Sequence, residues 1–359
     1  MTSLLKKVRL FIREEAPYCL ILSGVLLFHT FSSLYIFFHP APPTPQASES
    51  SFERAERILS AEPERVKLLL EKDPNLQLLG GFLFLFSLGI FVYGLFLNVR
   101  FWSKQHRGEW EYPWRLLPPR PAWGLRDVFR ISILLVFIAY LVEILQGVFL
   151  LFLKMDLPDQ VRLMVNTTFL DLVTLGMVFY WVVVQKNQSL RGLGFSAKHF
   201  GRHVAFALSS YAALLPLLAA SLLVSLWASD LIRLEAPEQP LYDVFFGESY
   251  QGMLGLAVFL VVLVGPIVEE TFFRGFLYNA LKRQWGKGWA IATSGVFFAA
   301  LHATWTGFLP IALLGVTLAY VYEVTATLVA SIALHALHNA LVMGFVFIMR
   351  DLLQRLAGG

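Results

Sequence analysis

The chain consists of long apolar runs that are separated by shorter polar segments. A helix needs about 20 mostly apolar residues to cross a bilayer. Nine runs come close to this length or exceed it: 18–38, 78–97, 128–153, 163–185, 204–227, 252–281, 289–305, 308–322 and 327–349. The run 308–322 is short for a full span. The pattern therefore predicts an all-α polytopic membrane protein with eight or nine transmembrane helices.

The composition supports this interpretation. Of the 359 residues, 57% are hydrophobic and 15% are charged, whereas about 25% are charged in a typical soluble domain. An intrinsically disordered chain and an ordinary cytosolic enzyme are therefore excluded. Cys19 is the single cysteine, so the chain can form neither an intramolecular disulfide nor a Cys-based zinc site. No basic run is interleaved with aromatic residues, so we expect no nucleic acid partner.

The distribution of Lys and Arg between the loops predicts the orientation. If the N-terminus is cytoplasmic, the inside segments 1–17, 98–127, 186–203 and 281–288 hold 17 Lys and Arg residues, and the outside segments hold 10. Cytoplasmic loops are enriched in these residues. We therefore expect an integral, multi-pass protein of the plasma (inner) membrane with a cytoplasmic N-terminus. Residues 39–77 would then form an extracytoplasmic loop.

Segment 98–127 combines basic residues with Trp102, Trp110, Trp114 and Trp123. Aromatic and basic residues are enriched where a membrane protein meets the lipid headgroups. We expect this segment to lie at the membrane interface.

Ionisable residues inside apolar helices are costly and are functional candidates by default. His29, Glu143 and Asp171 are each isolated in their run. A hydrogen bond between neighbouring helices, or a place beside a water-filled cavity, accounts for such residues. We interpret these three as structural.

The run 252–281 is different because it holds Glu269-Glu270-x-x-x-Arg274. Unpaired, the three charges would cost about 8–10 kcal/mol near the bilayer centre, so they must be paired or hydrated. Glu270 and Arg274 stand at i and i+4, in the favourable order for an ion pair that ties the helix. Glu269 points about 100° away and has no such partner. A free carboxylate beside a fixed ion pair is the arrangement expected of a general base.

Two further runs hold histidines. His302 lies in 289–305, and His335, His338 and Asn339 lie in 327–349, with His335 and Asn339 on one helix face. Taken alone, His302 is equally well explained as a buried core residue. However, a rise of 1.5 Å per residue from the predicted cytoplasmic ends puts Glu269, His302 and His335 each about 20 Å deep. The sequence therefore predicts that three helices bring them to one level.

The motifs Glu269-Glu270-x-x-x-Arg274, Phe298-x-x-x-His302 and His335-x-x-x-Asn339 together resemble those of one family. This is the CAAX prenyl protease and bacteriocin-processing (CPBP) family of intramembrane proteases, which includes the type II CAAX prenyl endopeptidases. The resemblance covers residues 252–349, and all three motifs occur in order. It suggests a division into N-terminal transmembrane helices, 1–203, and a CAAX-protease-like helical core, 204–359.

The resemblance implies an endopeptidase that hydrolyses peptide bonds of membrane-associated peptides or lipidated proteins, in a cavity open to the cytoplasm. By position it implies six catalytic residues: Glu269, Glu270, Arg274, His302, His335 and Asn339. Glu269 would activate water, and His302 would assist it or bind a metal. His335 and Asn339 would polarise the scissile carbonyl as an oxyanion hole. The ion pair would support the site.

The sequence alone does not require a metal. A catalytic zinc usually has three protein ligands and a water, and Glu269, His302 and His335 could provide them, with His338 as a spare. A metal-free site would use the same residues. Because the amide of Asn339 suits oxyanion binding better than strong ligation, we expect a divalent metal such as zinc to be weakly bound or absent.

Two other functions compete with a protease. The first is a non-catalytic relative of the same family, such as a bacteriocin self-immunity or regulatory membrane protein, which would use the site for binding. The second is a proton- or ion-coupled transporter, because intramembrane Glu and His residues also form proton relays. A transporter predicts polar residues in both halves of the chain. Here they are gathered in the last hundred residues, which disfavours transport.

Overall fold

The computed structural model is mostly helical over the part of the chain that it describes. That part comprises residues 8, 10–38, 67, 74–118, 120–155, 157–232, 254–302 and 304–358. It contains no strand, and eight of its helices are long and apolar enough to cross a membrane. The prediction of an all-α polytopic membrane protein is therefore confirmed.

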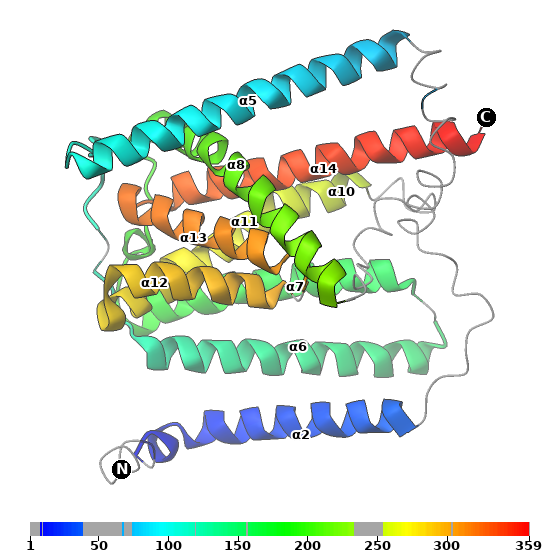
Figure 1. The fold of residues 1–359 in the computed structure, drawn as a ribbon. Coiled ribbons are helices and arrows are strands. Elements are labelled where there is room, and N and C mark those ends of the chain that lie inside the picture. The colour runs from blue at the N-terminus through cyan, green and yellow to red at the C-terminus, as the bar shows by residue number, and fades with distance from the viewer. Residues whose placement is uncertain are drawn as a thin grey trace.

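The first half of the chain forms long helices that alternate in direction along the sequence (Figure 1). They are α2 (Ala16–Phe38), α5 (Pro74–His106), α6 (Leu125–Leu153), α7 (Asp159–Phe179) with its π-helical continuation η1 (Tyr180–Gln185), the short η2 (Leu190–Leu193) and α8 (Phe200–Ile232). Helix α2 packs mainly on α6, and α5 mainly on α8, so both lie at the periphery (Figure 1). Most of the predicted loop 39–77 lies outside the described residues, and its last four residues already belong to α5.

Helix α2 is tied to α6 where it enters the bundle. The buried carboxylate of Glu15 accepts two hydrogen bonds from Arg130, each 2.7 Å long. These bonds hold the pKa of Glu15 below its ordinary value. Glu14 and Arg126 form a second, more exposed ion pair beside them.

The second half forms the core of the bundle. It comprises α10 (Leu254–Phe259), η4 (Leu260–Val264), α11 (Gly265–Glu270), η5 (Thr271–Tyr278), α12 (Asn279–Leu301), α13 (Phe308–Thr325) and α14 (Leu328–Gly358). The stretch 254–301 is continuous except at Gly286, whose φ of 78° breaks α12. The break at Gly286 lies between the predicted runs 252–281 and 289–305. The short run 308–322 is an 18-residue helix, which is long enough to span.

One predicted boundary is wrong, and it bears on the site. The run 289–305 was expected to be helical through His302, but α12 ends at Leu301 and His302 is its C-cap. The His302 ring Nδ1 lies 2.7 Å from the carbonyl oxygen of Phe298. This local hydrogen bond satisfies one of the carbonyls that a helix end leaves without a donor.

Helices α12 and α13 cross at two glycines. A Cβ atom added at Gly315 would lie 2.9 Å from the Cα of Gly295, and one at Gly295 would lie 2.6 Å from a side-chain carbon of Val316. Small residues let membrane helices approach this closely. The approach has a consequence for the site, because the carbonyl of Gly315 faces it.

Segment 107–124 is packed more deeply than the sequence predicts. The ring of Trp123 is fully buried, stacks on Phe276 and donates a hydrogen bond of 2.9 Å to the Phe276 carbonyl. The backbone N–H of Leu116 donates to the carbonyl of Thr325 at the end of α13. Trp123, one of the four tryptophans of this segment, is therefore packed inside the protein.

A buried carboxylate anchors the same segment. Glu323 of α13 accepts hydrogen bonds from Arg115 at 3.2 Å, from the hydroxyl of Tyr278 at 2.9 Å and from Lys282 at 2.5 Å. The Glu323 side chain is 7% exposed. It joins a segment between the early helices to two helices of the core.

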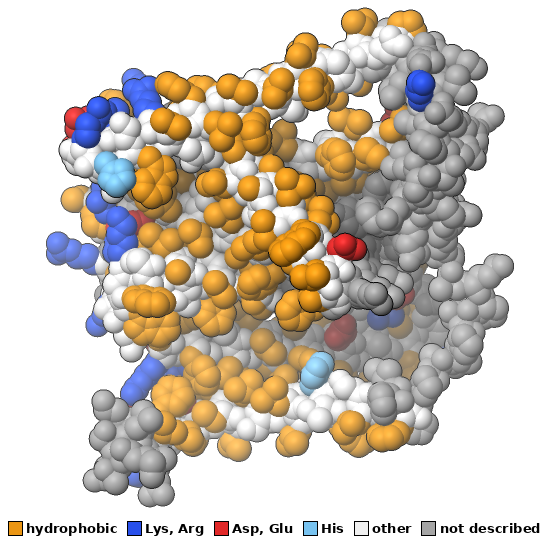
Figure 2. Space-filling model, viewed as in Figure 1, with side chains coloured by type: hydrophobic (Ala, Val, Ile, Leu, Met, Phe, Trp, Pro, Cys, Tyr) orange, Lys and Arg blue, Asp and Glu red, His pale blue; other side chains and the backbone are white. Residues whose placement is uncertain are grey.

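Lys and Arg side chains gather at one end of the bundle (Figure 2). The connections 107–124 and 186–199 and the break at Gly286 lie at this end, and the connection between α6 and α7 lies at the other (Figure 1). Each predicted inside segment that the structure describes therefore falls at the basic end. Which end faces the cytoplasm stays a prediction.

Cysteine labelling tests this orientation in a Cys19→Ser background. We expect Lys287→Cys, beside the Gly286 break, to be protected from a membrane-impermeant thiol reagent in intact cells. Asp159→Cys, at the start of α7 with its side chain 89% exposed, should be labelled. The reverse pattern would place the basic end outside and contradict the predicted topology.

Candidate active site

The two adjacent glutamates lie in a helix with irregular winding. Helix α11 is flanked by two π-helical stretches, η4 and η5, in which each backbone hydrogen bond spans one extra residue. Within α11, the Glu270 side chain is fully buried and the Glu269 side chain is 34% exposed. The two carboxylates therefore have different environments, as their 100° separation predicts.

Glu270 forms the predicted ion pair. Its Oε1 accepts a hydrogen bond of 2.6 Å from Nη1 of Arg274, and both side chains are fully buried. Nη2 of Arg274 donates to the carbonyl oxygen of Gly315 at 3.0 Å. The guanidinium also stacks on the ring of Phe298, 4.6 Å from its centroid. The cation is thus held by three helical segments.

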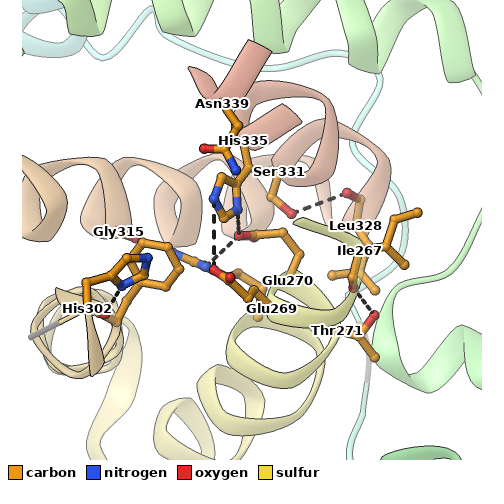
Figure 3. A network of polar contacts seen from close by, with 12 residues as sticks. Ile267, Glu269, Glu270, Thr271, His302, Gly315, Leu328, Ser331, His335 and Asn339 are labelled. Atoms are coloured by element: carbon orange, nitrogen blue, oxygen red, sulfur yellow. Dashed lines mark hydrogen bonds and ion pairs between the residues drawn. The ribbon is translucent and has the colours of Figure 1, made fainter. Parts of the chain in front are cut away.

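His335 joins the two glutamates from α14 (Figure 3). Its Nδ1 lies 3.1 Å from Oε1 of Glu270, and its Nε2 lies 3.9 Å from Oε2 of Glu269. Because a carboxylate only accepts, Nδ1 is the protonated ring nitrogen. Its Nε2 faces the carboxylate of Glu269. Glu270 therefore orients His335 as well as pairing with Arg274.

Two carboxylate oxygens in this cluster lack a donor. Among the described residues, Oε2 of Glu269 and Oε2 of Glu270 are buried and have no hydrogen-bond partner. Buried polar atoms are normally satisfied, so such atoms call for an explanation. A bound group with O–H or N–H donors would satisfy them.

Asn339, one turn beyond His335 on α14, contacts the irregular helix. Its Nδ2 donates a hydrogen bond of 2.8 Å to the carbonyl oxygen of Val261. In this π-helical register, Gly265 donates its N–H to the carbonyl of Leu260, five residues earlier. The N–H of residue 266 would donate to the carbonyl of Val261 in the same way, but this residue is Pro266, which has no N–H. Asn339 supplies that missing donor. One of its two amide N–H groups is therefore used in fixing η4.

The structure places His302 at the edge of this cluster. Its side chain is exposed, and its Nδ1 is the donor to Phe298, which leaves Nε2 free to accept. No hydrogen bond or ion pair joins it to Glu269 among the described residues. The ring of Phe298 contacts both His302 and His335, with ring centroids 4.6 and 5.5 Å apart. His302 is thus near the glutamates and separated from His335 by an aromatic ring.

Two more polar residues border the cluster. Nδ1 of His338 lies 3.2 Å from the hydroxyl of Tyr211 on α8, so this histidine connects two helices. Asp171 on α7 is close enough to Glu269 for their charges to interact. In the sequence, Asp171 stands alone in its apolar run. Only the packing of α7 on α11 reveals its proximity, since the two are about a hundred residues apart in the chain.

The residues named as metal ligands do not form a ligand set in this structure. Among the described residues, no three His, Cys, Asp or Glu side chains are grouped so that they could hold one metal ion. Glu269 and His335 face one another, whereas His302 contacts Phe298 and bonds the Phe298 carbonyl. The arrangement does not fit a bound zinc with these three ligands.

Removing one member of the ion pair between Glu270 and Arg274 should destabilise the protein strongly. We expect Glu270→Ala and Arg274→Ala each to cost about 3–5 kcal/mol of folding free energy, because each leaves a buried charge without its partner. The double variant should cost less than the sum of the two. Thermal unfolding in detergent measures this, with Glu269→Ala as the control that leaves the ion pair intact. Simple additivity would contradict a direct coupling between Glu270 and Arg274.

The comparisons with known proteins give one match. No curated protein and no solved structure was found to be similar to the chain. Residues 251–341, however, match the family described as Type II CAAX prenyl endopeptidase Rce1-like. The matched segment contains every residue of the cluster built around Glu270. The resemblance drawn from the three motifs is therefore confirmed over residues 251–341, about a quarter of the chain.

Proposed function

We propose that this protein is an intramembrane endopeptidase in which Glu269 activates the hydrolytic water. The observation that carries the proposal is the pairing of two unequal glutamates with one histidine. Glu270 is buried and neutralised by Arg274, while Glu269 is partly exposed and faces Nε2 of His335. A partly exposed carboxylate whose neighbours are already fixed is free to accept a proton.

The distance between Glu269 and His335 suits a shared water. At 3.9 Å, their facing atoms are too far apart for a direct hydrogen bond, and such gaps are commonly bridged by one water. That water would donate to the Glu269 carboxylate and attack the scissile carbonyl carbon. Glu269 would take its proton and then deliver it to the amine nitrogen as the C–N bond breaks.

The developing oxyanion needs donors aimed at it. His335 becomes such a donor when its Nε2 is protonated, and the contact between its Nδ1 and Glu270 stabilises that cation. Asn339 retains one amide N–H beyond the bond to Val261. His302, with Nε2 free at the end of α12, would contact the substrate at the exposed side. These roles follow the family resemblance and remain part of the proposal.

We further propose that the substrate is a membrane-associated peptide or lipidated protein, as in CAAX processing. The support is the match of residues 251–341 to the CAAX endopeptidase family. The alternative, a non-catalytic family relative, would share the fold and the buried ion pair. It would not require an intact carboxylate at Glu269.

Replacing the proposed base separates these alternatives. We expect Glu269→Gln to lower the rate of cleavage of a prenylated CAAX peptide by at least about 100-fold, since the amide keeps the shape but cannot accept a proton. Thermal unfolding should be unchanged. Glu143→Gln is the matched control, because Glu143 is an exposed carboxyl on α6 that no observation connects to the site. Cleavage at the wild-type rate by Glu269→Gln would show that the base is wrong.

A metal dependence is tested independently. Since Glu269, His302 and His335 do not form a ligand set in this structure, we expect activity of the purified enzyme to survive exhaustive chelation. Metal analysis of the active preparation should find less than stoichiometric zinc. Loss of activity on chelation with recovery on adding zinc alone would instead make His302 and His335 ligands.

A further inference from the structure

A cavity of about 450 Å³ lies at the basic end of the bundle, away from the candidate active site. Its walls are residues 113–118, from the segment between α5 and α6, together with Lys198 and His199 just before α8. None of these residues contacts the cluster around Glu270. The cavity is therefore a separate feature that the proposed protease activity does not use.

The charged side chains that line this cavity are all basic. Lys198 is exposed, and no carboxylate lies within ion-pair distance of it among the described residues. Arg115 uses one nitrogen for Glu323 and keeps a side chain that is 48% exposed. No acidic residue lines the cavity. An anionic group entering it would meet two cations without displacing an existing partner of Lys198.

The aromatic wall of the cavity is fixed in place. The guanidinium of Arg202 lies over the ring of Trp114, 4.8 Å from its centroid, and the ring of His199 packs against Trp114 at 5.3 Å. These contacts hold the indole between two cationic or polar side chains. Arg202 adds a third positive charge beside the cavity.

Leu117 stands out at the rim. It is 92% exposed, although the preceding Leu116 is partly buried and hydrogen-bonded to the core. A leucine so fully exposed next to cations would be unfavourable in water. Beside an indole and cationic side chains at the end of transmembrane helices, it is instead suited to the acyl-chain side of the membrane interface.

We propose that this cavity binds the phosphate group of an anionic phospholipid, with Leu117 inserted among the acyl chains. Lys198 and Arg115 would make charge-assisted hydrogen bonds to the phosphate. Basic clusters beside transmembrane helices recognise anionic headgroups in this way. The neighbouring exposed leucine favours a lipid over a free phosphate, which offers nothing for that side chain to contact.

Native mass spectrometry of the full chain in a neutral detergent tests the proposal, with phosphatidylglycerol and phosphatidylcholine as probes. We expect the wild type to retain one phosphatidylglycerol in preference to phosphatidylcholine. Lys198→Gln should weaken that binding about fivefold, the effect of losing one cation at a membrane surface. Lys287→Gln is the matched control, since it removes an exposed charge at the same end but outside the cavity. It should leave binding unchanged.

A second variant keeps the test decisive if Lys198→Gln alters folding. Leu117→Gln changes a side chain with almost no protein contact, and it should also weaken retention of phosphatidylglycerol. Equal weakening by Lys287→Gln would indicate a diffuse surface attraction and overturn the site. If inorganic phosphate bound as tightly as phosphatidylglycerol and Leu117→Gln did not change that binding, the ligand would be free phosphate and not a lipid. Absence of a preference for phosphatidylglycerol would overturn both.

Discussion

The candidate site depends on the buried contact between Glu270 and Arg274. Two full charges in a low-dielectric interior are tolerable only when each is compensated. Arg274 is compensated by Glu270, by the carbonyl of Gly315 and by the ring of Phe298. These partners come from three helical segments. The ion pair therefore fixes the positions of α12, of α13 and of α11, which carries Glu269, relative to one another. It also leaves Glu270 able to orient His335.

The sequence predicted the part of the site that local geometry determines. The i, i+4 spacing of Glu270 and Arg274 was sufficient to foresee their pairing, and helical rise alone placed Glu269 and His335 at a common level. The motifs also identified the family correctly. Each of these inferences relies on the regular periodicity of a helix.

What escaped prediction depends on irregular winding and on contacts between distant segments. The π-helical stretches around α11 leave no local signal as clear as a periodic pattern, so the bond from Asn339 to Val261 could not be foreseen. His302 was expected inside a helix, but its own side chain bonds the Phe298 carbonyl and marks the end of α12. The proximity of Asp171 to Glu269 and the burial of Trp123 could not be foreseen, because they involve partners that are far away in sequence.

The contacts of Glu323 indicate whether the second half of the chain could close its interior without the preceding segments. The family match begins at residue 251, yet Glu323 draws one of its three donors from Arg115, and Trp123 fills a core position against Phe276. A fragment cut at the family boundary would lack that guanidinium and would open a hole the size of an indole. The smallest unit that closes its own interior therefore starts before α6, and the segment between α5 and α6 is part of the packed core.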